Sequence, residues 1–258
     1  MTRRVGTALG AAAVWLVLLG VWWLVAAAKQ HPGTLWPTPA QVASSLWNLR
    51  SAFVQNAATT TKEAALGFAV GVVLAAAIAL VGERYRPITG SLQQLAIGVY
   101  SLPLIALAPV LVLWTGSGLA TKVVIAALAS FFPVLINLTQ ALRTTSPSAL
   151  ELMRVIGASP WQVFRRVELP YALPMLFAAF TVAAPAALLG AMLAEWVGAN
   201  SGLGIQLLSS MQNYDIPELY GCLAVASVLS LAIWLVFTVA QRRLFPWHSS
   251  QRSAEVRG

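Results

Sequence analysis

Residues 119–142 read LATKVVIAALASFFPVLINLTQAL, an apolar stretch with a single charged side chain, Lys122. A helix needs about 20 predominantly apolar residues to cross the bilayer core, so this stretch predicts a membrane-spanning helix. Five further stretches have the same character, at about residues 8–28, 61–81, 92–114, 174–197 and 219–240. They are too long and too uniformly apolar for the alternating strands of a barrel. The sequence therefore predicts one all-α integral membrane domain, residues 1–258, with six transmembrane helices.

The composition of the whole chain excludes other classes. Of its 258 residues 59% are hydrophobic and only 9% are charged, whereas about 25% of the residues in a soluble domain are charged. A soluble enzyme or a disordered binding protein is therefore excluded. The net charge is +8, but the basic residues are scattered, which argues against a nucleic-acid partner. The single cysteine, Cys222, excludes an intramolecular disulfide and a cysteine metal cluster, and we expect no metal site.

The basic residues predict the orientation in the membrane. With six spans and the N-terminus inside, 12 of the 16 Lys and Arg residues fall on the cytoplasmic side, and only Lys29, Arg50, Lys62 and Lys122 do not. This bias follows the positive-inside rule and predicts that both termini are cytoplasmic. The cytoplasmic residues are Arg3, Arg4, Arg84, Arg86, Arg143, Arg154, Arg165, Arg166, Arg242, Arg243, Arg252 and Arg257.

An outer helix is predicted over about residues 39–56. Thr38 and Pro39 form an N-cap followed by proline at the first helical position. Apolar residues then recur at helical spacing up to Phe53. Two interpretations are equally compatible with this pattern. The helix lies on the outer membrane face, or it packs against the spans.

The longest cytoplasmic connection, residues 143–173, has the signals of two helices joined by a tight turn. Ser148 and Glu151 fit a capping box, and Gly157 is the residue type that ends a helix in the left-handed conformation. The segment from Ser159 to Gln162 begins a second helix with a serine cap and a proline at the first position, and we expect it to stop at Leu169-Pro170.

Two aromatic residues of this segment, Trp161 and Phe164, face no obvious core of their own chain. An exposed aromatic pair on a rigid helical elbow favours docking of another protein. The alternative is that the elbow lies on the membrane surface with the rings at headgroup level. The residue pattern alone does not decide between the two.

The spacing in this segment resembles a known family. Glu151-Leu152-Met153, three residues, Gly157, nine residues and then Val167-Glu168-Leu169-Pro170 are similar to the EAA loop of binding-protein-dependent ABC importer permeases. The departures are Leu152-Met153 for two alanines and Val167 for isoleucine. The position of the segment between the fourth and fifth of six spans strengthens the resemblance.

Other segments extend the resemblance over nearly the whole chain. The segments 35–39, 102–109 and 114–118 resemble permeases of the nitrate, sulfonate and taurine type. The segments 181–185 and 194–199 resemble the subgroup for pyrimidine thiamine precursors and riboflavin. The fifth span has no cation of its own, so an organic solute of the second subgroup is favoured over a sulfonate, taurine or nitrate.

The resemblance implies a type I importer permease in the bacterial cytoplasmic (inner) membrane that pairs with a second copy of itself. Two cytoplasmic ATPase subunits, which would hold ATP and Mg, and an extracytoplasmic solute-binding protein are the implied partners. The chain itself has no G-x-x-x-x-G-K-[ST] segment, so it is not expected to hydrolyse ATP or bind a cofactor. The implied coupling residues are Glu151, Gly157, Ala158, Ser159, Trp161, Phe164, Leu169 and Pro170.

Four residues are candidates for the translocation path: Ser101, Pro103, Asn137 and Glu195. Glu195 lies near the end of an otherwise apolar span, where a carboxylate is a functional candidate. It either lines an outward cavity, bonded to Gln206 or Asn200, or sits at the interface and reaches water. Asn137 lines the path or bonds across packed helices.

Two other functions compete with this interpretation. An intramembrane serine protease needs a histidine within the spans, but His31 and His248 both lie outside them. A channel or secondary transporter would need charged relay residues or an internal repeat, and the sequence has neither.

Overall fold

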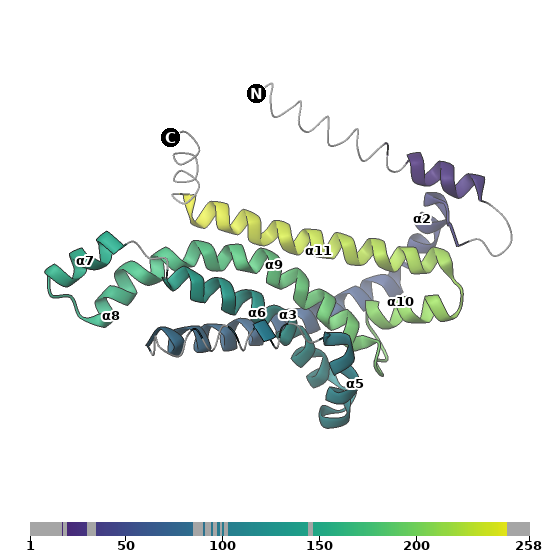
Figure 1. The fold of residues 1–258 in the computed structure, drawn as a ribbon. Helices are drawn as coiled ribbons and strands as arrows, with labels where there is room; N and C mark the ends of the chain where they lie inside the picture. Colours follow the sequence, from purple (N-terminus) through teal and green to yellow (C-terminus); the bar gives the residue numbers. More distant parts are fainter. Residues whose placement is uncertain are drawn as a thin grey trace, which may run out of the picture.

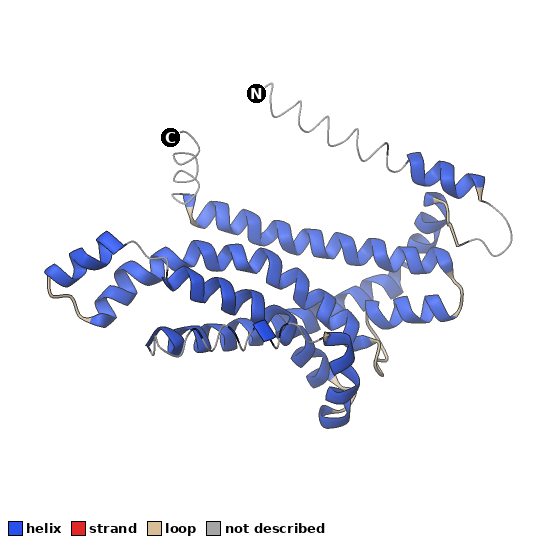
Figure 2. Ribbon diagram, viewed as in Figure 1, coloured by secondary structure: helices blue, strands red, loops and turns tan. Residues whose placement is uncertain are grey.

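A computed structural model of the chain describes residues 20–29, 35–84, 103–143 and 147–246, together with the single residues 17, 90, 94, 97, 98 and 100. Within these ranges the chain is helical and has no strand (Figure 1, Figure 2). The elements are α2 (Pro39–Asn48), α3 (Arg50–Arg84), α5 (Leu104–Thr115), α6 (Leu119–Arg143), α7 (Pro147–Val155), α8 (Pro160–Val163), the π-helical turn η1 (Phe164–Glu168), α9 (Leu169–Glu195), α10 (Leu203–Gln212) and α11 (Ile216–Leu244).

Four helical segments are long and apolar enough to cross a membrane. They are Arg50–Glu83, Leu119–Arg143, Pro160–Glu195 and Ile216–Leu244. They contain the predicted spans 61–81, 119–142 and 219–240 and nearly all of 174–197, so four of the predicted spans lie in apolar helices of sufficient length. α6 packs against both α3 and α9, which also contact each other, and α11 packs mainly against α9. Figure 1 shows α7 and α8 at one end of this bundle, the elbow end, and α2 and α10 at the opposite end.

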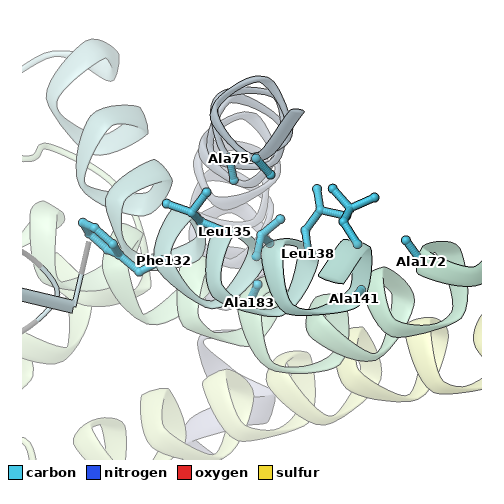
Figure 3. Close-up of a cluster of buried hydrophobic side chains, with 10 residues drawn as sticks. Ala75, Phe132, Leu135, Leu138, Ala141, Ala172 and Ala183 are labelled. Atoms are coloured by element: carbon cyan, nitrogen blue, oxygen red, sulfur yellow. The ribbon is translucent and has the colours of Figure 1, made fainter. Parts of the chain in front are cut away.

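Small residues bring α6 close to both of its neighbours. A Cβ atom at Gly71 of α3 would overlap Ser130, and one at Gly190 of α9 would overlap Ala129. Close backbone approach through small residues is how helices pack where no hydrophobic effect drives them together. Larger apolar side chains, including Phe132, Leu135 and Leu138 of α6, then fill the core between the helices (Figure 3).

The prediction of one outer helix over residues 39–56 is wrong, because its second half belongs to a different helix. α2 ends at Asn48, Leu49 leaves the helical conformation (φ −102°, ψ 19°), and α3 begins at Arg50. The bend has a packing reason, because α2 packs on α11 whereas α3 packs mainly on α6. Leu46 and Phe53 contact one buried cluster that also holds Leu203 and Cys222. α2 therefore packs on α11, which supports the packing interpretation of this helix.

The predicted third span, 92–114, is not one continuous helix. Pro103 is extended (φ −68°, ψ 108°), and the short helix α5 starts only after it. Residues 92, 93, 95, 96, 99, 101 and 102 lie outside the described part of the chain. A proline has no N–H to donate to a preceding turn and its ring clashes with that turn, so a helix tends to begin at or just after a proline, as α5 does here.

The second elbow helix does not stop at Leu169-Pro170, as the sequence suggested. α8, η1 and α9 form one uninterrupted helical segment, Pro160–Glu195. The π-helical turn explains the continuity, because the N–H of Leu169 donates to the carbonyl of Phe164 five residues back. This wider turn accommodates Pro170, which has no N–H and would clash with the preceding turn of a regular α-helix.

The remaining predictions on the fold are not decided by the structure. Of the predicted first span, 8–28, only residue 17 and the helical segment 20–28 are described. The number of six spans and the cytoplasmic location of both termini therefore remain predictions.

Candidate functional site

The elbow begins with α7, which ends in a Schellman motif. The N–H of Ala158 donates to the carbonyl of Met153 (2.9 Å), and the N–H of Gly157 donates to that of Arg154 (3.0 Å). Gly157 has φ +68°, the left-handed conformation that this motif requires. The prediction for Gly157 is confirmed. The predicted capping box of Ser148 and Glu151 is wrong, because α7 already begins at Pro147 and Ser148 lies inside its first turn.

The second arm of the elbow begins as the sequence predicted. The N–H of Gln162 donates to Ser159 Oγ (3.4 Å), and the N–H of Ser159 donates to Gln162 Oε1 (2.8 Å). This reciprocal capping box satisfies two backbone donors that the helix cannot pair. Pro160 occupies the first turn. Two local motifs therefore set the angle between α7 and α8.

The tip of the elbow exposes a set of large apolar side chains, the elbow patch. Val155 is 85% exposed and Trp161 is 65% exposed, and the patch also includes Leu152 and Ile156. The expectation that Trp161 and Phe164 both face away from the chain is wrong for Phe164. Their rings stack at 5.7 Å, but Phe164 packs against the core cluster of α6 and α9. Phe164 therefore holds Trp161 in position.

The other predicted coupling residues lie on or near the elbow patch. Glu151, Ser159 and Pro170 are exposed, whereas Ala158 and Leu169 are half-buried. A groove of about 770 Å³ lies elsewhere, between α9 and α11, and a second groove of about 670 Å³ adjoins the elbow. The second groove is lined by Leu80, Glu83, Pro160, Trp161, Val163, Phe164 and Glu168. The elbow thus combines an exposed apolar patch with an adjoining groove, and Trp161 belongs to both.

The end opposite the elbow is held by a buried polar cluster. The three backbone N–H groups of residues 202–204, at the start of α10, donate to Asn56 Oδ1 (2.9 Å), Thr60 Oγ1 (2.8 Å) and Glu195 Oε2 (2.5 Å), respectively. The first N–H groups of a helix have no partner within the helix, so α3 and α9 supply the N-terminal caps of α10. Sequence patterns cannot show this, because the caps come from distant segments.

Both interpretations of the Glu195 environment were wrong. Its side chain is 0% exposed, and it bonds to Thr60 and Gly204 rather than to Gln206 or Asn200. The physical reason is that the chain folds back after α9. Gly202 adopts the positive φ of +124° that this reversal needs, and α10 then covers the Glu195 carboxylate.

A buried ion pair joins α3 and α6, and it was not predicted from the sequence. Lys122 Nζ of α6 lies 2.9 Å from Glu63 Oε1 of α3, and both residues are buried. Glu63 lies inside the predicted span 61–81 and Lys122 inside 119–142. Two opposite charges in neighbouring apolar spans are a signal for pairing that the sequence did contain.

The other candidates for the translocation path are only partly placed. Ser101 lies outside the described residues, and Pro103 is an exposed residue that precedes α5. Asn137 is half-buried and donates to the carbonyl of Pro133 in its own helix (2.7 Å). The expected bond from Asn137 to a neighbouring helix is therefore replaced by a bond within its own helix.

The chain has clear relatives among known proteins. Residues 67–249 match the family described as "Binding-protein-dependent transport system inner membrane component". The chain is 31% identical to the riboflavin transport system permease protein RibX of Chloroflexus aurantiacus, over 94% of this chain and 91% of that protein. It is 30% identical to the formylaminopyrimidine transport permease protein ThiX of Halalkalibacterium halodurans, over 92% of this chain and 94% of that protein.

Among solved structures, an amino acid ABC transporter crystallised with histidines has a similar fold. The alignment has a TM-score of 0.64 at 19% sequence identity and covers 77% of this chain and 97% of that one. At this level of identity the likeness extends to the fold alone.

Proposed function

The chain belongs to the family of binding-protein-dependent transport system inner membrane components, the permeases of ABC transporters, and from this premise we propose that its elbow couples solute import to ATP hydrolysis. In this proposal two cytoplasmic ATPase subunits, which bind ATP and Mg, grip the elbow. The permease pairs with a second copy of itself in the bacterial inner membrane, and an extracytoplasmic binding protein delivers the solute.

The observation that carries the proposal is the elbow patch. Leu152, Val155, Ile156 and Trp161 are all more than half exposed, although each is large and apolar. Such a concentration at the tip of a rigid motif is typical of a protein–protein contact, in which a few buried aromatic and apolar anchors supply most of the binding energy. Glu151, Gly157, Ala158, Ser159, Trp161, Phe164, Leu169 and Pro170 are the proposed coupling residues.

The helix behind the patch is suited to transmitting a push. The segment Pro160–Glu195 is continuous over 36 residues, which corresponds to about 54 Å at 1.5 Å per residue. Trp161 lies at its start and is fixed by its stacking on Phe164. A movement of the elbow is therefore passed along one continuous helical segment to the opposite end of the bundle. Pro103 and Asn137, with Ser101, remain the proposed path residues.

For the solute, we propose a small organic molecule such as a pyrimidine thiamine precursor or a riboflavin-like compound. Support comes from the names of the two relatives that are 30% and 31% identical, a formylaminopyrimidine permease and a riboflavin permease. A sulfonate or taurine is the alternative, since permeases named for these solutes are 26% and 25% identical.

The test is co-purification and transport. The chain should co-purify with an ABC ATPase, and Trp161→Ala should weaken that association and reduce uptake. Ser148→Ala, a change at an exposed residue of α7 outside the patch, is the matched control and should behave as the unmodified chain. Solute uptake by the purified permease without any ATPase would contradict the proposal.

A further inference from the structure

Three exposed arginines flank the elbow patch. They are Arg154 of α7 and Arg165 and Arg166 of η1. They come from both arms of the elbow, since Arg154 directly precedes Val155 of the patch and Arg165 follows Trp161 by about one helical turn. The apolar patch therefore has basic side chains on either arm.

The chain itself offers little negative charge to balance these arginines. None of the three side chains forms an ion pair with another residue in the described part of the chain. Glu151, one turn before Arg154, is the exposed carboxylate of the described elbow. Two further carboxylates, those of Glu83 and Glu168, line the adjoining groove, where they are half-buried and buried, respectively. The exposed surface around the patch therefore carries a net positive charge.

The arginines lie beyond the membrane boundary of the neighbouring spans. Gln241 Nε2 of α11 donates to the carbonyl of Pro174 (3.0 Å), so the basic end of α11, at Arg242, is level with Pro174. Basic residues at the end of a span mark the membrane interface. Arg165 precedes Pro174 by nine residues in one continuous helical segment, or by about 13 Å, whereas each headgroup layer is only about 6 Å thick. Figure 1 also shows α7 and α8 beyond the ends of α6 and α11, so a soluble protein fits these arginines better than lipid headgroups.

We propose that the elbow patch fits a groove of the ATPase that has an apolar floor and an acidic rim, an inference that rests on the proposed coupling role of the elbow. The apolar side chains of the patch contact the floor, and Arg154, Arg165 and Arg166 pair with carboxylates of the rim. Protein interfaces combine an apolar centre with a polar rim, and complementary rim charges speed association and exclude wrong partners. Arginine suits this role, because its planar guanidinium group binds a carboxylate through two parallel hydrogen bonds.

The test measures binding between the full-length permease and the ABC ATPase that co-purifies with it. The permease is kept in a neutral detergent without added lipid, and the Kd is measured as the ionic strength rises. Binding by the unmodified chain should weaken with salt, because screening reduces the attraction between exposed charges. The double variant Arg154→Glu/Arg165→Glu should bind roughly tenfold more weakly at low ionic strength, since each reversed charge replaces a modest attraction with a similar repulsion.

Two matched variants separate the effect of charge from other effects. Arg154→Lys/Arg165→Lys keeps both positive charges and should retain most of the affinity. Arg50→Glu reverses the charge of an exposed arginine at the opposite end of the bundle and should bind as the unmodified chain does. If the double glutamate variant does not assemble, the salt dependence of the unmodified chain and the variant Arg154→Gln/Arg165→Gln test the same charges.

The outcomes separate this inference from the proposed coupling role. If the unmodified chain binds no ATPase, the coupling role fails and this inference falls with it. If Trp161→Ala weakens binding but neither salt nor the double glutamate variant does, the elbow docks without an acidic rim and only this inference is overturned. It is also overturned if the double glutamate variant binds the ATPase normally in detergent and loses uptake only in vesicles that contain phosphatidylglycerol, since the arginines would then contact lipid headgroups.

Discussion

Gly157 offers the sharpest test of the elbow, because the structure separates two effects of a side chain at this position. A Cβ atom at Gly157 would have no atom within 4 Å, so the added Cβ itself creates no clash. The penalty for adding it comes from the backbone, which is held at φ +68°. For a residue other than glycine this conformation costs about 1–2 kcal/mol, and more for a β-branched residue.

The magnitude of the effect follows from that cost. About 2 kcal/mol lowers the population of the Schellman turn by roughly thirtyfold relative to open conformations of the elbow. Gly157→Val should therefore lower solute-stimulated ATP hydrolysis and uptake in proteoliposomes while the permease still assembles in the membrane. Gly157→Asn is the control, because asparagine tolerates the left-handed region and should retain much of the activity.

The reasoning is refuted if Gly157→Val couples hydrolysis to uptake as efficiently as the unmodified protein. It is also refuted if Asn and Val at this position have equal effects, since the backbone cost differs between them. Loss of the assembled permease in the membrane would point to a role in folding, which the open space around Gly157 does not predict.

Two substitutions and one labelling experiment test the packing of the bundle. Gly71→Val forces a side chain into Ser130 and should destabilise the permease by about 1–3 kcal/mol, measured as a lower melting temperature in detergent. Asn56→Leu removes the acceptor of the Gly202 N–H and the donor to Gln206, and each group left unpaired should cost about 1–3 kcal/mol in the same assay. Cys222 is fully buried, so maleimide should label it slowly in the folded permease and rapidly after denaturation.

Exposed neighbours on the same helix provide the controls. Ala69→Val and Gln55→Leu change α3 at exposed positions and should leave the melting temperature nearly unchanged. Equal destabilisation by Gly71→Val and Ala69→Val would contradict the close approach of α3 and α6. Fast labelling of Cys222 in the folded permease would contradict the packing of α2 and α3 against α11.

The features that the sequence predicted correctly depend on residues close together in the chain. The length of the apolar stretches predicted four membrane-spanning helices, because the thickness of the bilayer dictates the number of residues in a span. The left-handed Gly157 and the capping box at Ser159 and Gln162 were also predictable, since each is made by residues within a few positions of one another. Motifs of this range depend little on the rest of the fold.

The tertiary structure decided what depends on contacts between distant segments. The helix breaks at Leu49, where local periodicity would continue it, because α2 packs on α11 whereas α3 packs mainly on α6. Glu195 is buried because α10 folds back over it and because Thr60, 135 positions earlier in the chain, meets its carboxylate. The pairing of Glu63 with Lys122 likewise exists only because α3 and α6 lie together. Helix packing determines which polar groups of the apolar spans contact one another. The pattern of a single sequence does not contain this information.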